Sequence, residues 1–260
     1  MAQLGRGAES PRCACRVRPR TVDPRRLPCE VRVRRAVTDF VRFPSTPYLV
    51  RPRGVDVRDD KVLDEAERDE FLSGPLHVEE KIDGQNLGIS GGEDGLLFQA
   101  RGSYVQPGGR HFRGLSTWIE PRRRRLASAL GTELVLFGEW CAITHSVSYD
   151  QLPDWFLIFD VYEKTAGRFW DPEMRDAFAD EVGLFTVPFL AVGDFTLDTL
   201  TGLIQRSRVG HEQMEGVVAR SAASTGPQRR AKLVRPDFVQ QIDRHWMTEQ
   251  HTMNRLRSSG

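Results

Sequence analysis

Five short stretches of this chain carry a charged residue within, or at the end of, an apolar run with the composition of a β-strand: EKIDG (80–84), FGEW (137–140), IFDVY (158–162), EGVV (215–218) and AKLVRP (231–236). Burying an unpaired charge is costly, so such charges usually face a binding site or a partner. One such residue would mean little, but five along one chain predict strands that converge on a single cleft. The cleft would hold two lysines, two glutamates and an aromatic ring: Lys81, Lys232, Glu139, Glu215 and Phe159.

Lysine is rare in this sequence, which has 33 arginines but only four lysines, at positions 61, 81, 164 and 232. Arginine stays protonated in proteins, whereas a lysine amine becomes a nucleophile once its pKa is lowered. Lys61 and Lys164 lie in polar stretches that are typical of surface charges. Lys81 and Lys232 belong to two of the five stretches, which makes them candidate site residues.

Runs of strand composition outnumber helical runs and mostly follow hairpin-like spacing, which predicts an α+β fold with antiparallel sheets. Strands are expected over 76–82, 86–90, 96–102, 133–143, 155–163, 214–221 and 230–238. Helices are expected over 62–72, 115–131 with a break near Pro121, 171–183 with Asp171 as N-cap, 195–208 and 236–256.

Hydrophobic residues make up 39% of the 260-residue chain and charged residues 28%, proportions typical of a soluble globular protein. No apolar run approaches the roughly 18–20 residues of a membrane span. The start of the chain lacks the apolar core of roughly 7–15 residues that a secretory signal needs. We therefore expect a cytoplasmic protein without a membrane partner. Four cysteines without a CxxC pair or suitably spaced histidines predict neither a zinc site nor a disulfide framework.

Residues 1–36 differ from the rest of the chain, since they carry ten arginines and a formal charge of +7 within a total of +1. They are rich in proline and show no helical or strand period. Three interpretations are open: a disordered arm, an arm that attracts nucleic acid through clustered arginines, and an extension upstream of the true start. We treat residues 1–36 as a disordered arm and residues 37–260 as the folded domain.

The order of the five stretches resembles the covalent nucleotidyltransferase superfamily, which includes ATP-dependent DNA ligases, RNA ligases and mRNA capping enzymes. Within it, the chain is most similar to RNA ligases of the phage RNA ligase 2 type. Those enzymes share the order K-x-D/H-G, F-G-E, an aromatic-Asp strand, E-G and a lysine-bearing strand. The resemblance covers about residues 40–245. A lone KxDG is a weak signal, but the ordered set, with intervals of 58, 20, 56 and 17 residues, is specific.

The resemblance implies a nucleotidyltransferase (adenylation) domain that uses ATP and Mg²⁺ or Mn²⁺. A lysine amine, Lys81, would attack the α-phosphate of ATP and keep AMP in covalent attachment. The AMP would then pass to a 5′-phosphate end, and a 3′-hydroxyl would displace it and seal the strand. RNA with these two ends is the expected partner, in RNA repair, together with a repair partner protein or the arginine arm.

The resemblance also assigns roles around the first motif. Lys81 would be the nucleophile, and Glu80 and Asn86 would help to shape the nucleotide pocket. Asp83 and Gly84 would complete the loop, with Gly84 allowing the backbone to approach the nucleotide.

The remaining matched positions contact the rest of the substrates. Arg101 would contact the nucleotide and the 5′-phosphate end, and Glu139 the ribose hydroxyls. Phe159 would stack on adenine. Glu215 would hold the catalytic metal or its waters, and Lys232 would contact the α-phosphate.

One position departs from the family pattern, whose last strand carries two lysines one residue apart. Here Lys232 stands alone. Arg230 lies on the same strand face and is the first candidate for the missing partner, and Arg235 is the second. Glu79 is expected to point outward. His145 is either a loop histidine or a contact to the nucleic-acid end, and Arg122–Arg125 is interpreted as a solvated helix face.

Only 23 residues follow Asp237, too few for the oligonucleotide-binding (OB) fold that DNA ligases and capping enzymes of this superfamily need. We therefore expect a domain without an appended OB-fold, which favours an RNA ligase. The alternatives are a DNA ligase, a GTP-dependent capping guanylyltransferase, and a non-catalytic nucleotide- or RNA-binding module of the same fold.

Overall fold

The computed structural model describes most of the folded region predicted from the sequence: residues 40–52, 57, 62–93, 95–109, 112–221, 229–238 and 252–258. The expected arm over residues 1–36, Lys61 and residues 239–251 lie outside the described residues. None of the helices in the described part of the chain is long and apolar enough to cross a membrane.

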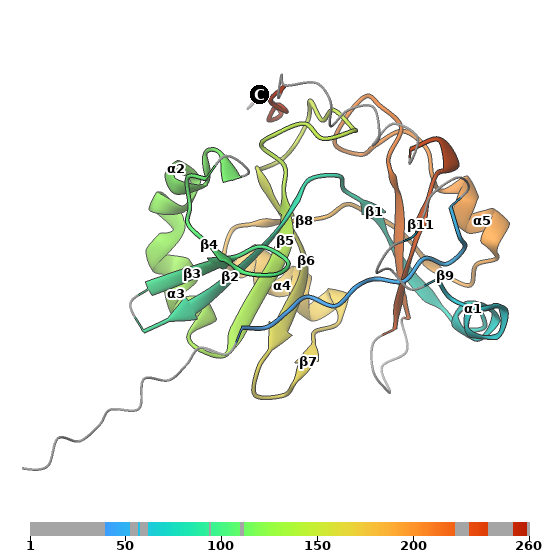
Figure 1. The fold of residues 1–260 in the computed structure, drawn as a ribbon, viewed down its shortest axis with the longest axis horizontal. Helices are drawn as coiled ribbons and strands as arrows, with labels where there is room; N and C mark the ends of the chain where they lie inside the picture. Colours follow the sequence, from blue (N-terminus) through green and yellow to red (C-terminus); the bar gives the residue numbers. More distant parts are fainter. Residues whose placement is uncertain are drawn as a thin grey trace, which may run out of the picture. The chain divides into compact units, whose positions relative to one another are not determined.

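Two β-sheets lie side by side within the described residues (Figure 1). The smaller sheet has the order β11 (Arg230–Val234), β10 (Gly216–Ser221), β1 (Leu76–Lys81) and β9 (Phe189–Gly193). The larger sheet has the order β4 (Tyr104–Val105), β3 (Gly95–Gln99), β2 (Gln85–Gly92), β5 (Leu134–Trp140), β6 (Phe156–Glu163) and β7 (Arg168–Phe169), and β8 (Phe185–Thr186) pairs with β6. All pairs of named strands are antiparallel except β6 with β8. The predicted α+β class is confirmed.

Helices cover the outer face of each sheet. The smaller sheet packs on α1 (Glu65–Leu72) and α5 (Leu197–Gly202), and the larger on α2 (Leu115–Ile119), α3 (Arg123–Leu130) and α4 (Pro172–Glu181). A 3₁₀ turn, η2 (Glu120–Arg122), separates α2 from α3 at the predicted Pro121 break. Asp171 caps α4 as expected, since its side chain accepts a hydrogen bond from the Met174 N–H.

Two helix predictions are wrong in extent. Helix α5 ends at Gly202 instead of running to 208, because Gly is a poor helix former. The expected helix over 236–256 is helical only at 236–238 among its described residues. Residues Met253 and Leu256 instead form β-bridges to Ile143 and Leu152, so this end of the chain is extended.

Side-chain alternation gives the smaller sheet one apolar and one polar face. Residues such as Val78, Val217 and Leu233 pack in the core under α1 and α5. Their neighbours point the other way, toward the larger sheet, because successive strand residues alternate between faces. This second face carries the charged residues Glu79, Lys81, Arg220, Arg230 and Lys232.

A β-bulge in β6 places two functional side chains on one face. Phe137 pairs with Asp160 and Gly138 with Ile158, which leaves Phe159 as the extra residue. Phe159 and Asp160 therefore both turn toward the smaller sheet, whereas Ile158 packs under the helices. Bulges commonly re-aim a side chain in this way next to binding sites.

Candidate functional site

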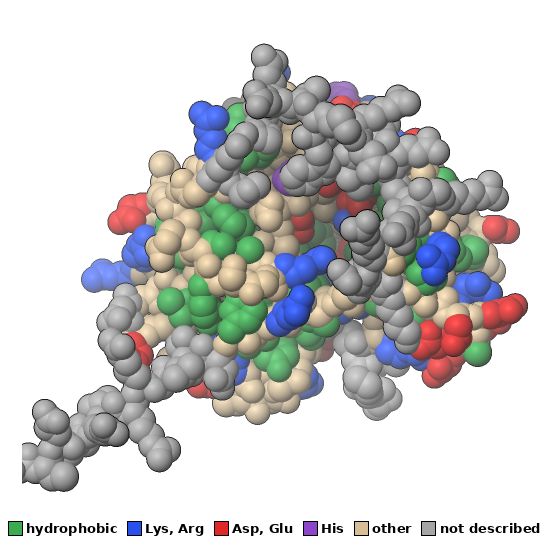
Figure 2. Space-filling view, viewed as in Figure 1, with side chains coloured by type: hydrophobic (Ala, Val, Ile, Leu, Met, Phe, Trp, Pro, Cys, Tyr) green, Lys and Arg blue, Asp and Glu red, His purple; other side chains and the backbone are tan. Residues whose placement is uncertain are grey.

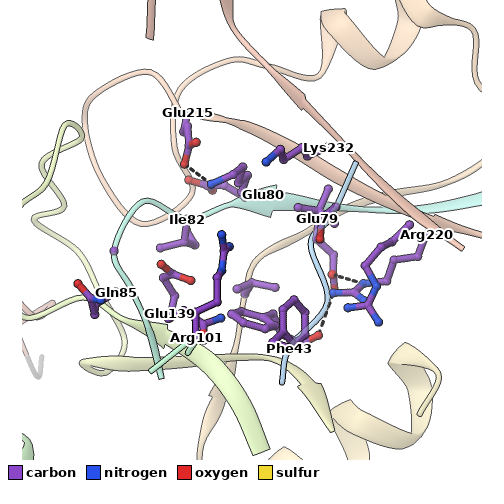
Figure 3. A pocket seen from close by; sticks show the side chains of 18 of the residues that line it. Phe43, Glu79, Glu80, Ile82, Gln85, Arg101, Glu139, Glu215, Arg220 and Lys232 are labelled. Carbon is purple, nitrogen blue, oxygen red and sulfur yellow. Dashed lines mark hydrogen bonds and ion pairs between the residues drawn. The ribbon is translucent and has the colours of Figure 1, made fainter. Parts of the chain in front are cut away.

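A pocket of about 450 Å³ opens between the two sheets (Figure 3). Its walls contain ten of the residues predicted from the sequence to form the site: Glu80, Lys81, Gly84, Asn86, Arg101, Glu139, Phe159, Glu215, Arg230 and Lys232. Asp83 lies outside it. The space-filling view shows acidic and basic side chains close together in the middle of the face that is turned toward the viewer (Figure 2). The five stretches therefore converge on one cleft, as predicted.

Lys81, at the end of β1, donates a hydrogen bond from its Nζ to the Glu215 carboxylate at 2.6 Å. Burial alone would lower the pKa of Lys81, but the carboxylates of Glu215 and Glu139 raise it above its ordinary value. Lys81 is therefore a charged ammonium in this pocket.

Two carboxyl groups beside Lys81 have pKa values well above those of exposed glutamates. Burial raises the pKa of Glu139 to about 8 and that of Glu215 to about 7, although the positive charge of Lys81 opposes both shifts. Each therefore exchanges its proton near neutral pH. Such groups are typical of catalytic sites.

The pocket fits a metal held largely by its substrate. Among the described residues, no group of three His, Cys, Asp or Glu side chains is arranged to hold a metal ion. Mg²⁺ is usually bound through one or two carboxylates, with waters and phosphate oxygens completing its shell. Glu215, which lines the pocket, is a carboxylate that fits this mode of binding.

Asp83 supports the loop that follows Lys81 from outside the pocket. Its carboxylate accepts hydrogen bonds from the backbone N–H groups of Ser146 (2.6 Å) and Val147 (3.0 Å). Its own N–H donates to the Tyr149 hydroxyl at 2.8 Å. Asp83 therefore ties the Lys81 loop to residues 141–152.

Gly84 also allows a close approach within the protein, between the Lys81 loop and strand β5. A Cβ atom at this position would lie 2.7 Å from the Trp140 carbonyl oxygen and 3.0 Å from Cγ of Glu139. The close approach is thus to strand β5, and it brings the Lys81 loop against Glu139.

The segment 252–258 holds residues 141–152 in place through hydrogen bonds. Asn254 is buried, and its amide nitrogen donates to the Cys141 carbonyl at 2.8 Å. Its amide oxygen accepts from the Thr144 hydroxyl and the Tyr149 N–H. Sequence reasoning assigned this segment to a helix and missed the link.

Glu80 has a structural contact within the pocket wall. Its carboxylate accepts hydrogen bonds from the Ser207 hydroxyl (2.6 Å) and the Arg208 N–H (2.8 Å). Burial raises the pKa of Glu80, and these two donors oppose the shift.

Glu79 was expected to point outward, and this prediction is wrong. Its side chain is 1% exposed and pairs with Arg175 of α4 at 2.6 Å and Arg220 of β10 at 2.9 Å. Burial would raise the pKa of Glu79, but the two guanidinium groups hold it well below its usual value. The face alternation of β1 explains the position, since Glu79 lies on the same side as Lys81.

Arg220 lines the pocket and links the two sheets. It donates to the Asp160 carboxylate at 2.8 Å and to the Phe159 carbonyl at 2.9 Å. Arg175 donates to the same carbonyl at 3.0 Å. The bulged residue Phe159 is therefore held from both sides, and only its ring faces the pocket.

Arg230 lines the pocket, but its guanidinium is already engaged. It pairs with Asp160 and lies over the rings of Phe43 (5.0 Å) and Phe169 (4.3 Å). Arg235 pairs with Asp237 and does not line the pocket, and neither does the loop residue His145.

Three pocket residues come from a segment that the motif analysis did not use: Phe43, Thr46 and Tyr48. The Phe43 ring lies 5.1 Å from the Phe159 ring, and the Tyr48 ring lies 3.9 Å from the Lys232 Nζ. This segment lies near the start of the predicted folded domain and belongs to none of the five stretches from which the site was predicted.

Comparison with known proteins gives a consistent result. A family model described as RNA ligase matches residues 74–234. Among solved structures, the chain is similar to Naegleria gruberi RNA ligase with PPi, with a TM-score of 0.53 and 17% identity. A mutant of the same enzyme with ATP and Mn gives a TM-score of 0.52 and 15% identity. At such identities the structures support the fold alone.

The match to the solved enzymes is partial. The alignment covers 67% of this chain and 53% of the PPi structure, and 75% and 58% for the ATP and Mn structure. The chain therefore spans about half the length of these enzymes. No curated protein sequence matches it closely enough to count as a relative.

Proposed function

This chain belongs to the RNA ligase family, and from that premise we propose that it is an ATP-dependent RNA ligase that forms a covalent lysyl-AMP. The observation that carries the proposal is the position of Lys81. Its amine lies in a pocket between two sheets, 2.6 Å from Glu215, and Lys232 lines the same pocket.

In the first step, the Lys81 nitrogen attacks the α-phosphorus of ATP. A nitrogen–phosphorus bond forms as the bond to the bridging oxygen of the β-phosphate breaks, and pyrophosphate leaves. Lys81 must lose a proton before it attacks, and binding of Glu215 to the metal would withdraw the carboxylate that now stabilises the ammonium form. Mg²⁺ or Mn²⁺ near Glu215 would offset the phosphate charge and favour the neutral amine.

The other pocket residues bind and orient the nucleotide. The Phe159 ring would stack on adenine, with Val218 of β10 as the apolar surface in the opposite sheet. Glu139 would accept hydrogen bonds from the ribose hydroxyls. Lys232 would contact the α-phosphate, where negative charge is densest during transfer.

The later steps require RNA ends. A 5′-phosphate oxygen takes the AMP from Lys81, which regains its amine, and Arg101 would contact that end. The 3′-hydroxyl oxygen then attacks the activated 5′-phosphate, a phosphodiester forms and AMP leaves. This chemistry suits RNA repair.

Labelling of the protein itself tests the first step. We expect α-labelled ATP with Mg²⁺ to leave label that survives denaturation in detergent on wild-type protein and none on Lys81→Arg, whereas Lys164→Arg, at a surface lysine, keeps the label. Absence of label on folded wild-type protein would favour a non-catalytic module. Label from GTP but not ATP would favour a capping enzyme.

The polymer specificity needs a second assay. We expect the labelled protein to seal a nick whose 3′-hydroxyl strand is RNA. Sealing of all-DNA nicks, with none of RNA-containing nicks, would favour a DNA ligase.

A further inference from the structure

Residues 47–49 lie along the free edge of the smaller sheet, outside the part of the chain that matches the family model. The Lys232 N–H donates to the Pro47 carbonyl at 2.9 Å, and the Leu49 N–H donates to the Lys232 carbonyl at 2.8 Å. On the other side, the Leu63 N–H donates to the Tyr48 carbonyl at 2.9 Å. The backbone of Tyr48 is therefore fixed on both sides and is in register with Lys232.

The Tyr48 ring contacts the ammonium group of Lys232. The Lys232 Nζ lies 3.9 Å from the ring centroid, well within the range of a cation–π interaction. Lys232 is only 8% exposed, so water does little to screen this contact. Both residues line the nucleotide pocket.

Without such a contact, a lysine side chain does not hold its ammonium group in a fixed position. Its ammonium sits on a flexible four-carbon stem, and its three donors rotate freely. Arg230, the residue expected to assist Lys232, is engaged by Asp160 and by two aromatic rings. A ring whose backbone is held on both sides restricts the movement of the Lys232 stem.

We propose that Tyr48 is a positioning residue that aims the Lys232 ammonium at the α-phosphate, in the role that a second lysine would have in the family pattern. The inference rests on the proposed function of Lys232. It concerns the aromatic ring and not the hydroxyl, because the contact is to the ring face.

Two variants of Tyr48 distinguish the effect of the aromatic ring from the effect of side-chain volume. Tyr48→Phe keeps the ring face, so the single-turnover rate of lysine adenylylation should stay within about twofold of wild type. Tyr48→Leu removes the ring face, and the rate should fall by about tenfold, the size of a desolvated cation–π contact. Tyr104→Leu, at an exposed ring outside the pocket, is the matched control and should not change the rate.

The amplitude of label incorporation reports the folded, active fraction, and the rate constant reports the chemistry. A purely structural role for Tyr48 would lower the amplitude and leave the rate constant unchanged, which would overturn the proposal. A double-mutant cycle adds a second criterion. Because Tyr48 acts through Lys232, the Tyr48→Leu effect should disappear in a Lys232→Ala background. An equal effect in both backgrounds would also overturn it.

The small number of lysines allows a test that is independent of catalysis. Selective ¹³C-labelling of lysine gives ε-methylene signals from four positions, and Lys232→Arg identifies the signal of interest. We expect the Tyr48 ring current to displace this signal in wild type and Tyr48→Phe, and the displacement to vanish in Tyr48→Leu. An undisplaced signal in wild type would refute the contact. A displaced signal in a protein that takes no label from ATP would refute the proposed function and leave the ring contact standing.

Discussion

The amine of Lys81 and the carboxylate of Glu215 lie 2.6 Å apart, one on β1 and the other at the start of β10. The proposed nucleophile is thus paired with the proposed metal ligand. Glu215 raises the pKa of Lys81, so the free pocket holds the lysine in its unreactive, charged form. Under the proposed function, binding of nucleotide and metal would rearrange this pair, and the amine would be protected from side reactions until ATP is present.

The pair predicts how Lys81 reacts with an external amine reagent. A carboxylate stabilises the ammonium form, so Glu215→Gln should lower the pKa of Lys81 and move the onset of acylation to lower pH. The measurement is the modified fraction of each lysine against pH, by mass spectrometry without nucleotide. Lys164, whose Nζ donates to the Thr132 carbonyl on the surface, is the internal control and should keep its profile. An unchanged Lys81 profile in Glu215→Gln would contradict the electrostatic account.

The sequence predicted the class of fold and the contents of the pocket, because both depend on patterns local to each strand. Charges within apolar runs located the residues that converge, and Pro121 and Asp171 marked helix boundaries correctly. Each of these signals can be recognised from a few adjacent residues.

Features that depend on long-range pairing could not be predicted from the sequence. The bulge at Phe159 arises from the register between β5 and β6, and the burial of Glu79 depends on Arg175 and Arg220 from distant elements. The Tyr48 contact depends on an edge pairing with Lys232. No local pattern in the sequence indicates which distant residue will be the partner.

The raised pKa of Glu139 predicts that this residue weakens the fold at alkaline pH. The folded state favours protonated Glu139 up to about pH 8, whereas the unfolded chain loses that proton near 4.5. Stability contributed by the proton is therefore lost as pH rises from 4.5 to 8. Glu139→Gln should raise the free energy of unfolding at pH 8 by roughly 1–2 kcal/mol, less than the full shift implies because the protein and water rearrange around a buried carboxylate when it ionises.

Urea unfolding at several pH values measures this effect. The gain should shrink toward zero at pH 4.5, where Glu139 is protonated in both states. A variant that is destabilised equally at both pH values would show that the carboxylate has a structural role.

The Glu79 cluster should contribute strongly to stability. Glu79→Gln leaves the buried guanidinium groups of Arg175 and Arg220 short of one negative charge, which should cost about 3 kcal/mol. The exposed pair of Glu70 and Arg229 is the matched control, and Glu70→Gln should cost less than about 1 kcal/mol. Urea unfolding at pH 7 compares the two.

The pH dependence of the same cluster has the opposite sign to that of Glu139. The folded state holds the pKa of Glu79 below its usual 4.5, so its contribution is present above that pH and is lost as the pH falls below it. Wild type should therefore lose stability below pH 4.5 more steeply than Glu79→Gln. Parallel acid profiles would contradict the ion-pair assignment.

Asn254 should control the local stability of residues 141–152. Asn254→Ala removes the side-chain hydrogen bonds to Cys141, Thr144 and Tyr149, worth about 1 kcal/mol each. Amide hydrogen exchange should become faster at Ser146 and Val147, the donors to Asp83, whereas Ser258→Ala should change nothing. Unchanged exchange at these two amides would separate the 252–258 segment from the Lys81 loop.

Stacking of adenine on Phe159 predicts a loss of nucleotide affinity when the ring is removed. Phe159→Leu should weaken ATP binding by about 1–3 kcal/mol, which is roughly five- to 150-fold in the dissociation constant. The titration is done in a Lys81→Ala background so that no covalent step follows binding. Phe189→Leu, at an exposed ring on edge strand β9 outside the pocket, is the matched control.

Because Phe159 is held at its carbonyl by Arg175 and Arg220, the backbone should stay in place when the ring is lost. Equal ATP affinity in the two variants would place the adenine elsewhere in the pocket.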